Sequence, residues 1–165
     1  MQSEGLSMAQ STVRTAAAPT TITLDHGLAC GTTVLTLDGI LPVEFLTPGD
    51  RIVTRDGAQR LAAIEVTVVQ NARVIRITEG TLGIDQPTGD MIVSPDQPIL
   101  VRDWRAKALC GTSVALVPAA KLVDGEYIRA EVLTEVRFYA LRFADEAVIY
   151  ACGLELACAP DLTNA

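Results

Sequence analysis

The chain has 165 residues, of which 49% are hydrophobic, and it carries a formal net charge of −7 with a sequence pI near 4.6. This length suits one domain with a sizeable core. The acidic balance argues against nucleic acid or an anionic membrane as partner, because both are bound through clusters of Lys and Arg. No apolar run approaches the roughly 18 residues that a membrane-spanning helix needs, so none is predicted.

The amino-terminal stretch, residues 1–20, is rich in Ser, Ala, Thr and Gln without periodicity, which is typical of a flexible leader. It lacks the basic start and apolar core of a secretory signal, so we expect a cytoplasmic protein, or one exported without a classical signal peptide. The folded domain is expected over residues 21–157, beginning with a strand at Thr20–Leu24. Residues 158–165 are expected to form a tail.

Short runs rich in β-branched residues, separated by Gly, Pro and Asp, follow one another along the rest of the chain and indicate an all-β domain. One helical turn is expected at 104–109 and another at 119–122, and a loop at 81–89. Pro98 cannot donate a ladder hydrogen bond, which restricts its strand to an edge or places Pro98 at the start. The predicted strands are 32–37, 51–54, 59–69, 72–78, 91–93, 98–101, 127–133, 136–143 and 147–151.

One segment, 31–57, reads as strand, turn, short connector, turn and strand, with turn signals at Asp38-Gly39 and Thr47–Asp50. Its pattern of Pro, Leu, Gly-acidic and Ile positions recurs in the second half of the chain without a gap. This recurrence indicates an internal duplication and two half-domains related by a pseudo-dyad. The matching residues are Leu41-Pro42-Val43, Leu46, Gly49-Asp50 and Ile52 in the first copy, and Val117-Pro118-Ala119, Leu122, Gly125-Glu126 and Ile128 in the second.

Several of these motifs, in this order and spacing, resemble the Hint domain, the autoprocessing fold of Hedgehog proteins and inteins, and most closely its bacterial branch. The resemblance covers roughly Leu24 to Leu156. It implies a flattened, pseudo-two-fold β horseshoe whose ends meet at the active site. The motifs are Gly31-Thr32, Val34, Thr36, Gly39, Pro42-Val43-Glu44, Gly49-Asp50, Val93-Ser94-Pro95-Asp96, Leu100-Val101-Arg102, Trp104-Arg105-Ala106, Leu116-Val117-Pro118-Ala119 and Val148-Ile149-Tyr150.

The resemblance also implies a chemistry. In active Hint domains a cysteine, four residues before the Gly-Thr pair, attacks the preceding carbonyl and turns an amide into a thioester. A histidine in a Ser/Thr-x-x-His turn protonates the departing nitrogen, and further histidines lie in the last two strands. Here the nucleophile position holds Gly27 and the acid position Gln97, while the two later positions hold Ala140 and Glu146. Glutamine cannot deliver a proton near neutral pH.

Two other residues are weaker catalytic candidates. Cys30 lies three residues beyond the expected nucleophile, about 10 Å along a strand and on its other face, so we expect a buried thiol that fills space. Asp96 would serve as an acid if burial raised its pKa, but beside Pro95 it is expected to form the turn. The four cysteines, Cys30, Cys110, Cys152 and Cys158, are expected to be reduced and mostly buried, with a Cys152–Cys158 disulfide as the alternative.

The remaining polar and aromatic residues give little sign of a site. The single histidine, His26, and the absence of any CxxC leave poor material for zinc, and no cofactor is predicted. His26 would occupy the substrate side of the cleaved bond in an active relative, but before a glycine it is expected to be a turn residue. Asn164 lacks the neighbours of the asparagine that inteins cyclise, and Trp104 is expected in the core.

The sequence therefore favours a Hint-like domain that has lost its self-cleaving residues and persists as a structural module or a module that binds a protein partner. The alternative is an active autoprocessing domain with an unorthodox nucleophile such as Cys30. A third hypothesis is a β-rich assembly domain unrelated to processing.

Overall fold

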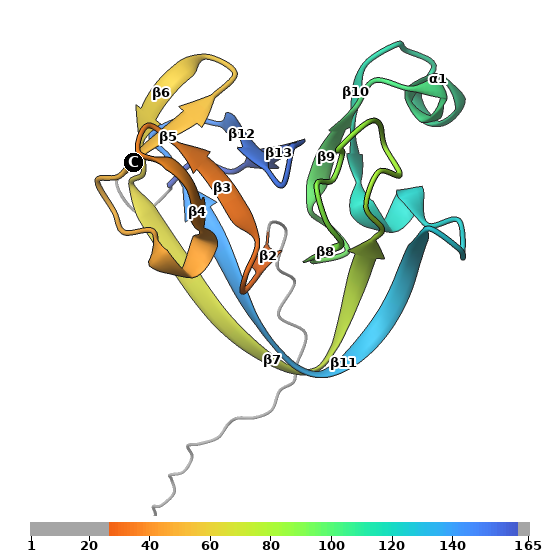
Figure 1. The fold of residues 1–165 in the computed structure, drawn as a ribbon, viewed down its shortest axis with the longest axis horizontal. Helices are drawn as coiled ribbons and strands as arrows, with labels where there is room; N and C mark the ends of the chain where they lie inside the picture. The colour runs from red at the N-terminus through yellow and green to blue at the C-terminus, as the bar shows by residue number, and fades with distance from the viewer. Residues whose placement is uncertain (1–26, 162–165) are drawn as a thin grey trace, which may run out of the picture.

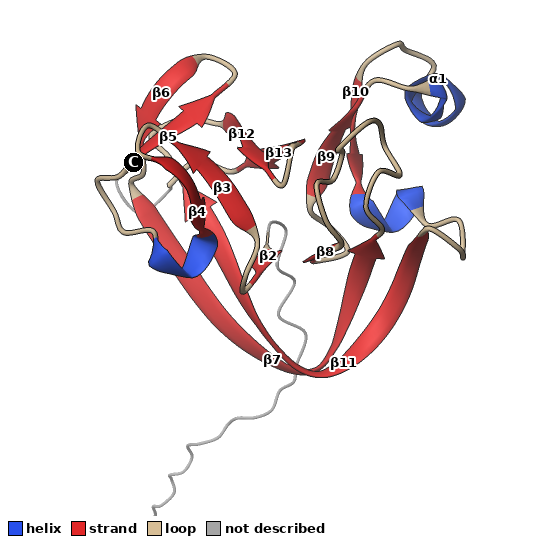
Figure 2. Ribbon diagram, viewed as in Figure 1, coloured by secondary structure: helices blue, strands red, loops and turns tan. Residues whose placement is uncertain are grey.

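The computed structural model describes residues 27–161, so the leader, the strand expected at Thr20–Leu24, His26 and Asn164 lie outside the described residues. Strands make up most of the fold and helices are few and short (Figure 2), as predicted for an all-β domain. In chain order the elements are β2 (Leu28–Ala29), β3 (Thr33–Thr36), β4 (Gly39–Pro42), η3 (Val43–Phe45), β5 (Arg51–Thr54), β6 (Gly57–Arg60), β7 (Ala63–Ile77), β8 (Met91–Val93), β9 (Pro98–Val101), α1 (Trp104–Cys110), β10 (Ala115–Pro118), η4 (Ala119–Leu122), β11 (Ile128–Arg142), β12 (Ala147–Ala151) and β13 (Leu154–Cys158).

Two long antiparallel strands, β7 and β11, form the base of a horseshoe (Figure 1). They pair along their whole length and carry a lobe at each end: β3 to β6 at one, β9, β10 and α1 at the other. The two short strands that flank the gap between the lobes, β2 and β8, close a ring with β7 and β11. The predicted pseudo-two-fold horseshoe is confirmed.

The remaining strands form one eight-stranded sheet that reaches through both lobes, in the order β10-β9-β13-β12-β3-β5-β6, with β4 added to β3. Buried apolar residues alternate along these strands, and one continuous core cluster joins the two lobes. Strands β10 and β6 are the two ends of this order, so they present the open edges of the sheet.

The internal duplication appears in the structure as two equivalent turns. Pro42 and Pro118 each precede a 3-10 turn with nearly the same backbone angles, φ −61°, ψ 143° and φ −58°, ψ 139°. Leu46 and Leu122 are both buried after these turns, and Ile52 and Ile128 are both fully buried in the following strands. Because the same residue types occupy the same local geometry, the two segments pack alike against the core.

The long strands differ from the sequence prediction, which divided each of them in two. The ladder continues past the predicted breaks because Gln70 pairs with Glu135 and Ala72 with Leu133. Asn71, between these pairs, has a left-handed φ of 49°, a conformation that asparagine adopts more readily than most residues. The break that the sequence predicted at this point is therefore one irregular residue within a continuous strand.

Other strand predictions hold in part. Strands β5, β8, β9 and β12 have the predicted bounds, and Pro98 begins β9. The loop at 81–89 holds no named strand or helix. Strand β13 was not predicted, and it takes in the first residue of the expected tail, Cys158, because Cys158 pairs with Ala147. Asp161 then donates its N–H to the carbonyl of Phe143, so the chain stays bound to the lobe beyond β13.

The prediction for Trp104 is wrong. Its side chain is 69% exposed, because Trp104 begins α1 on the outside of the lobe. Asp103 caps this helix by accepting a hydrogen bond from the N–H of Arg105, and the Arg105 guanidinium lies over the Trp104 ring, 4.8 Å from its centre.

Among the described residues, no helix is long and apolar enough to cross a membrane.

Candidate functional site

Gly27, at the position expected for the nucleophile, lies directly before β2. Strand β2 pairs with β11 through Leu28 and with β8 through the same residue, so the chain at this point is held from both sides. The carbonyl of Gly27 accepts a hydrogen bond from the N–H of Ser94, 3.0 Å away. This contact brings the Ser94–Gln97 turn against Gly27.

The turn places Gln97 beside the backbone nitrogen of Gly27. Pro95 favours the turn conformation, and the turn closes when Gln97 donates its N–H to the Ser94 carbonyl, at 3.1 Å. The side chain of Gln97 is 2% exposed, and its Oε1 accepts the N–H of Gly27 at 2.9 Å. The two positions matched from the family motifs therefore meet in the structure, 70 residues apart in sequence.

The Gln97 amide is fully engaged on both sides. While Oε1 accepts from Gly27, Nε2 donates to the carbonyl of Pro98 at 3.0 Å and to that of Ala157 at 2.9 Å. These partners fix the amide orientation, because only the NH₂ group can donate to two carbonyls. Gln97 thus joins the start of β2 to β13 and β9. At the nitrogen where a general acid would donate a proton, it offers an acceptor.

A side chain at residue 27 would make tight contacts with Phe138. A Cβ built on Gly27 would stand 3.3 Å from Cδ1 of Phe138 and 3.4 Å from its Cβ and Cγ. Phe138 is 2% exposed and lies opposite Ala29 in the pairing of β11 with β2. Sequence reasoning did not single out Phe138, because its proximity to Gly27 depends on strand register and on no local pattern.

One buried polar atom near this site has no partner among the described residues, the hydroxyl of Ser94. Ser94 is 2% exposed, and its backbone N–H and carbonyl both take part in the contacts of the turn. Asp96, at the tip of the same turn, is exposed, whereas its neighbour Gln97 is buried. Asp96 therefore points away from Gly27, as its expected role in the turn requires.

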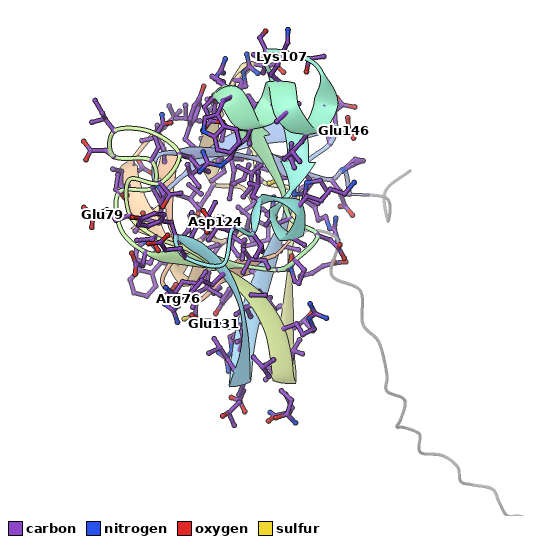
Figure 3. The ribbon with its side chains drawn as sticks, turned by 90° about the vertical axis from the view of Figure 1, so that its right-hand side faces the viewer. Arg76, Glu79, Lys107, Asp124, Glu131 and Glu146 are labelled. Atoms are coloured by element: carbon purple, nitrogen blue, oxygen red, sulfur yellow. The ribbon has the colours of Figure 1, made fainter. Side chains whose placement is uncertain are left out.

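The two later family-equivalent positions provide no catalytic group at this site. Ala140 is 1% exposed within β11, opposite Glu65 of β7, and its methyl group has no acid–base chemistry. Glu146 is exposed in the turn between β11 and β12, and Figure 3 shows it at the surface. Neither residue has a hydrogen bond to Gly27 or Gln97.

The prediction that Cys30 is buried is wrong. It lies exposed in the turn between β2 and β3, which closes when Thr32 donates its N–H to the Ala29 carbonyl. The Glu44 carboxylate lies nearby, and the Cys30 thiol makes a small contribution to lowering the pKa of Glu44. The N–H of Gly31 donates to Glu44, at 2.8 Å, and this bond is the main reason why the pKa of Glu44 lies below its ordinary value.

Cys30 lines a cavity of about 180 Å³ that is separate from the contact of Gly27 with Gln97. Arg76, Asp90 and Cys152 lie on its other walls. Cys152 is half-buried and its sulfur is 3.6 Å from the Thr33 hydroxyl.

The four cysteines are free, as expected, but most of them are not buried. Cys30 and Cys110 are exposed, and Cys152 is half-buried. Only Cys158 is buried, and burial raises the pKa of its thiol to about 12. No disulfide joins Cys152 to Cys158, and the described residues contain no cluster of three or more His, Cys, Asp or Glu side chains that could hold a metal ion.

Comparison of the sequence with models of protein families supports the fold described above. The family model of the Hint domain matches residues 26–158, which is most of the chain. The chain belongs to the Hint-domain family. No curated protein matches it in sequence.

Solved structures show the same fold at low sequence identity. The Hint domain described here is similar to a bacterial intein-like domain from Clostridium thermocellum, with 17% identity and a TM-score of 0.58 over 81% of this chain and 98% of that one. It is also similar to the gp41-1 intein, with 15% identity and a TM-score of 0.53 over 79% of this chain and 96% of the intein. It is also similar to a DnaB intein from Synechocystis sp. PCC 6803, with 9% identity and a TM-score of 0.54 over 81% of this chain and 99% of that one.

Proposed function

We propose that this Hint domain does not cleave its own backbone at residue 27 and serves instead as a folded structural or binding module. The observation that carries the proposal is the hydrogen bond from the Gly27 N–H to Oε1 of Gln97. Cleavage requires a proton to reach this nitrogen as it leaves. An amide oxygen bound to the N–H holds the peptide in place and has no proton to give.

The nucleophilic step of the reaction also lacks its reactive group. An acyl shift needs a sulfur or oxygen on residue 27, and glycine has neither. The ring of Phe138 lies in tight contact with the position that the Cβ of such a side chain would take. Together with the three hydrogen bonds of the Gln97 amide, this packing supports a role for the former reaction centre in joining β2, β9 and β13.

A second candidate function is cleavage by Cys30. It is favoured by the exposure of this thiol and by the cavity it shares with Cys152 and Arg76. The same cavity is not lined by Gly27 or Gln97, so a reaction there would act on a different peptide bond from the one that the family cleaves.

The intact mass of the purified full chain distinguishes the two functions. The chain is incubated at neutral pH with dithiothreitol or hydroxylamine, either of which would release a thioester or ester. We expect the mass to remain that of the full chain. A fragment that begins at Gly27 would overturn the proposal. A fragment that disappears in Cys30→Ala but persists in the matched variant Cys110→Ala would establish the second candidate, because both cysteines are exposed.

A further inference from the structure

Two pairs of arginines in this fold face each other directly across antiparallel strands. Arg76 of β7 lies opposite Arg129 of β11, and Arg51 of β5 lies opposite Arg60 of β6. Like charges at such positions repel and destabilise the strand pair unless an opposite charge lies between them.

The first pair has this opposite charge. Oε2 of Glu131 accepts hydrogen bonds from Nε of Arg76 at 2.9 Å and from Nη2 of Arg129 at 3.0 Å. Glu131 is two residues beyond Arg129, so it stands on the same face of the ribbon in the next cross-strand row. Figure 3 shows Arg76 and Glu131 side by side on β7 and β11. One carboxylate in the adjacent row thus holds both guanidinium groups.

The second pair has no such carboxylate. The adjacent row beside Arg51 and Arg60 consists of Val53 and Ala58, and neither carries a charge. Both arginines are exposed, and within residues 27–161 neither has an ion pair or a side-chain hydrogen bond. Six other arginines do have an acidic partner in this part of the chain: Arg55, Arg76, Arg102, Arg105, Arg129 and Arg142. Arg51 and Arg60 therefore form an opposed pair without a neutralising carboxylate, although the chain as a whole is acidic.

Exposed apolar side chains extend this face on the side of Arg51 that is away from β6. Leu37 donates its N–H to the carbonyl of Arg51, and its side chain is 56% exposed. Ile40 lies on β4, which pairs with β3, and is 67% exposed. Arg60 belongs to β6, the last strand of the sheet, whose outer edge has no partner strand in the described residues. We call Leu37, Ile40, Arg51 and Arg60 the arginine face.

We propose that the arginine face binds an extended segment of a partner protein, with an Asp or Glu carboxylate bridging Arg51 and Arg60 as Glu131 bridges the other pair. Charge complementarity carries the choice of partner, because one carboxylate can accept hydrogen bonds from two opposed guanidinium groups, as Glu131 does from Arg76 and Arg129. The open edge of β6 would supply backbone hydrogen bonds to an added strand, whose side chains on this face would lie next to Arg60. The inference specifies the partner in the proposed binding function, and it does not depend on the cleavage experiments.

The test is an NMR titration of the full ¹⁵N-labelled chain with a capped peptide in which valine and glutamate alternate, compared with the same peptide carrying glutamine for glutamate. We expect shifts at Gly57–Arg60 and Leu37 with the glutamate peptide, and affinity lower by about tenfold for the glutamine peptide, since a hydrogen bond to a charged group is lost. Added salt should weaken the binding, because the arginines are exposed.

Matched variants of the arginine face make the test specific. Arg60→Gln should lower the affinity by about tenfold. Ala58→Glu should lower the affinity by at least about tenfold while keeping both arginines, because it places a carboxylate in the adjacent row, as in the first pair. Arg73→Gln, which removes an exposed arginine without an ion pair elsewhere in β7, should leave the affinity unchanged. The ¹⁵N spectrum of each variant shows whether it is folded.

Three results would overturn the proposal. One is the absence of shifts on the arginine face with the glutamate peptide. Another is an equal response to inorganic phosphate, with no preference for the peptide, which would indicate a site for small anions only. The third is binding of phosphatidylserine vesicles in place of the peptide, which would make this face a membrane contact. Because none of these measurements involves the bond before Gly27, each leaves the proposed lack of cleavage to its own experiment.

Discussion

The ring of Phe138 lies 3.3 Å from the point at which a Cβ of residue 27 would stand. This contact means that a larger side chain at residue 27 would press against Phe138. Restoring the cysteine alone would require Phe138 to move slightly away from residue 27, and where a core cannot adjust, overpacking costs about 1–3 kcal/mol. Both the missing nucleophile at residue 27 and the close packing of Phe138 therefore favour the proposed lack of cleavage.

The first prediction restores the reaction in steps. Gly27→Cys with Gln97→His is expected to give a destabilised chain that cleaves poorly, because Phe138 crowds the new thiol. Adding Phe138→Leu should relieve the contact and allow cleavage after His26 with dithiothreitol, as measured by intact mass. Gln97→His with Phe138→Leu, which still lacks a nucleophile, is the matched control. A folded triple variant that stays intact would show that the scaffold no longer holds the cleavage geometry.

The second prediction concerns the structural role of Gln97. Replacing it with Leu leaves the Gly27 N–H and the carbonyls of Pro98 and Ala157 without their partner, and each buried group left unpaired costs about 1–3 kcal/mol. We expect the free energy of unfolding in urea to fall by at least about 3 kcal/mol. Asp96→Leu, one residue away and exposed, should change it by less than about 0.5 kcal/mol.

The variant Gln97→Glu adds a test of the amide orientation. Ionised glutamate can accept from Gly27 but repels the two carbonyls, so the folded-state pKa of the new carboxyl should be raised. A raised pKa means that the folded state binds more protons than the unfolded state, so the penalty should shrink as pH falls through that pKa. If Gln97→Glu were as stable as the wild-type chain at pH 7, the assigned donors and acceptors would be wrong.

The third prediction uses thiol reactivity at neutral pH. Burial raises the pKa of Cys158 to about 12, so its thiolate is scarce and covered, and it should react with iodoacetamide only after unfolding. Cys30 and Cys110 are both exposed and should react in the folded chain at similar rates, as followed by peptide mass. A much faster reaction of Cys30 than of Cys110 would argue for the second candidate function.

The fourth prediction concerns the pH dependence of stability. Hydrogen bonds from Arg129 and, next, from Arg76 hold the pKa of Glu131 below its ordinary value of 4.5. A lowered folded-state pKa contributes stability that is present above pH 4.5 and is lost as pH falls through the folded-state value. Glu131→Gln should therefore destabilise the chain at pH 7 and differ little from the wild-type chain at pH 2. Equal stability of both at pH 7 would remove the basis for comparing the two arginine pairs.

The sequence identified the positions Gly27 and Gln97 because each is defined by a local motif, the Gly-Thr pair and the Ser-Pro turn, whose order is typical of the Hint family. The hydrogen bond between the two residues is seen only in the structure. The sequence did not reveal Phe138 or the opposed arginines, because both depend on which residues face each other across strands, and strand register is not written in a local pattern. Cys30 was placed in the core because free cysteine is usually buried, but a turn, not a strand, follows Ala29.

The last prediction tests the duplication energetically. Leu46 and Leu122 hold equivalent places after the two 3-10 turns and are 5% and 3% exposed. Because each fills the core at the same local geometry, Leu46→Ala and Leu122→Ala should each lower the free energy of unfolding by about 2–5 kcal/mol. Leu37→Ala, at an exposed position, should change it by less than about 0.5 kcal/mol. Urea denaturation of the three variants measures these values. A large cost at one equivalent leucine and none at the other would show that the two halves, although alike in backbone, do not support the core alike.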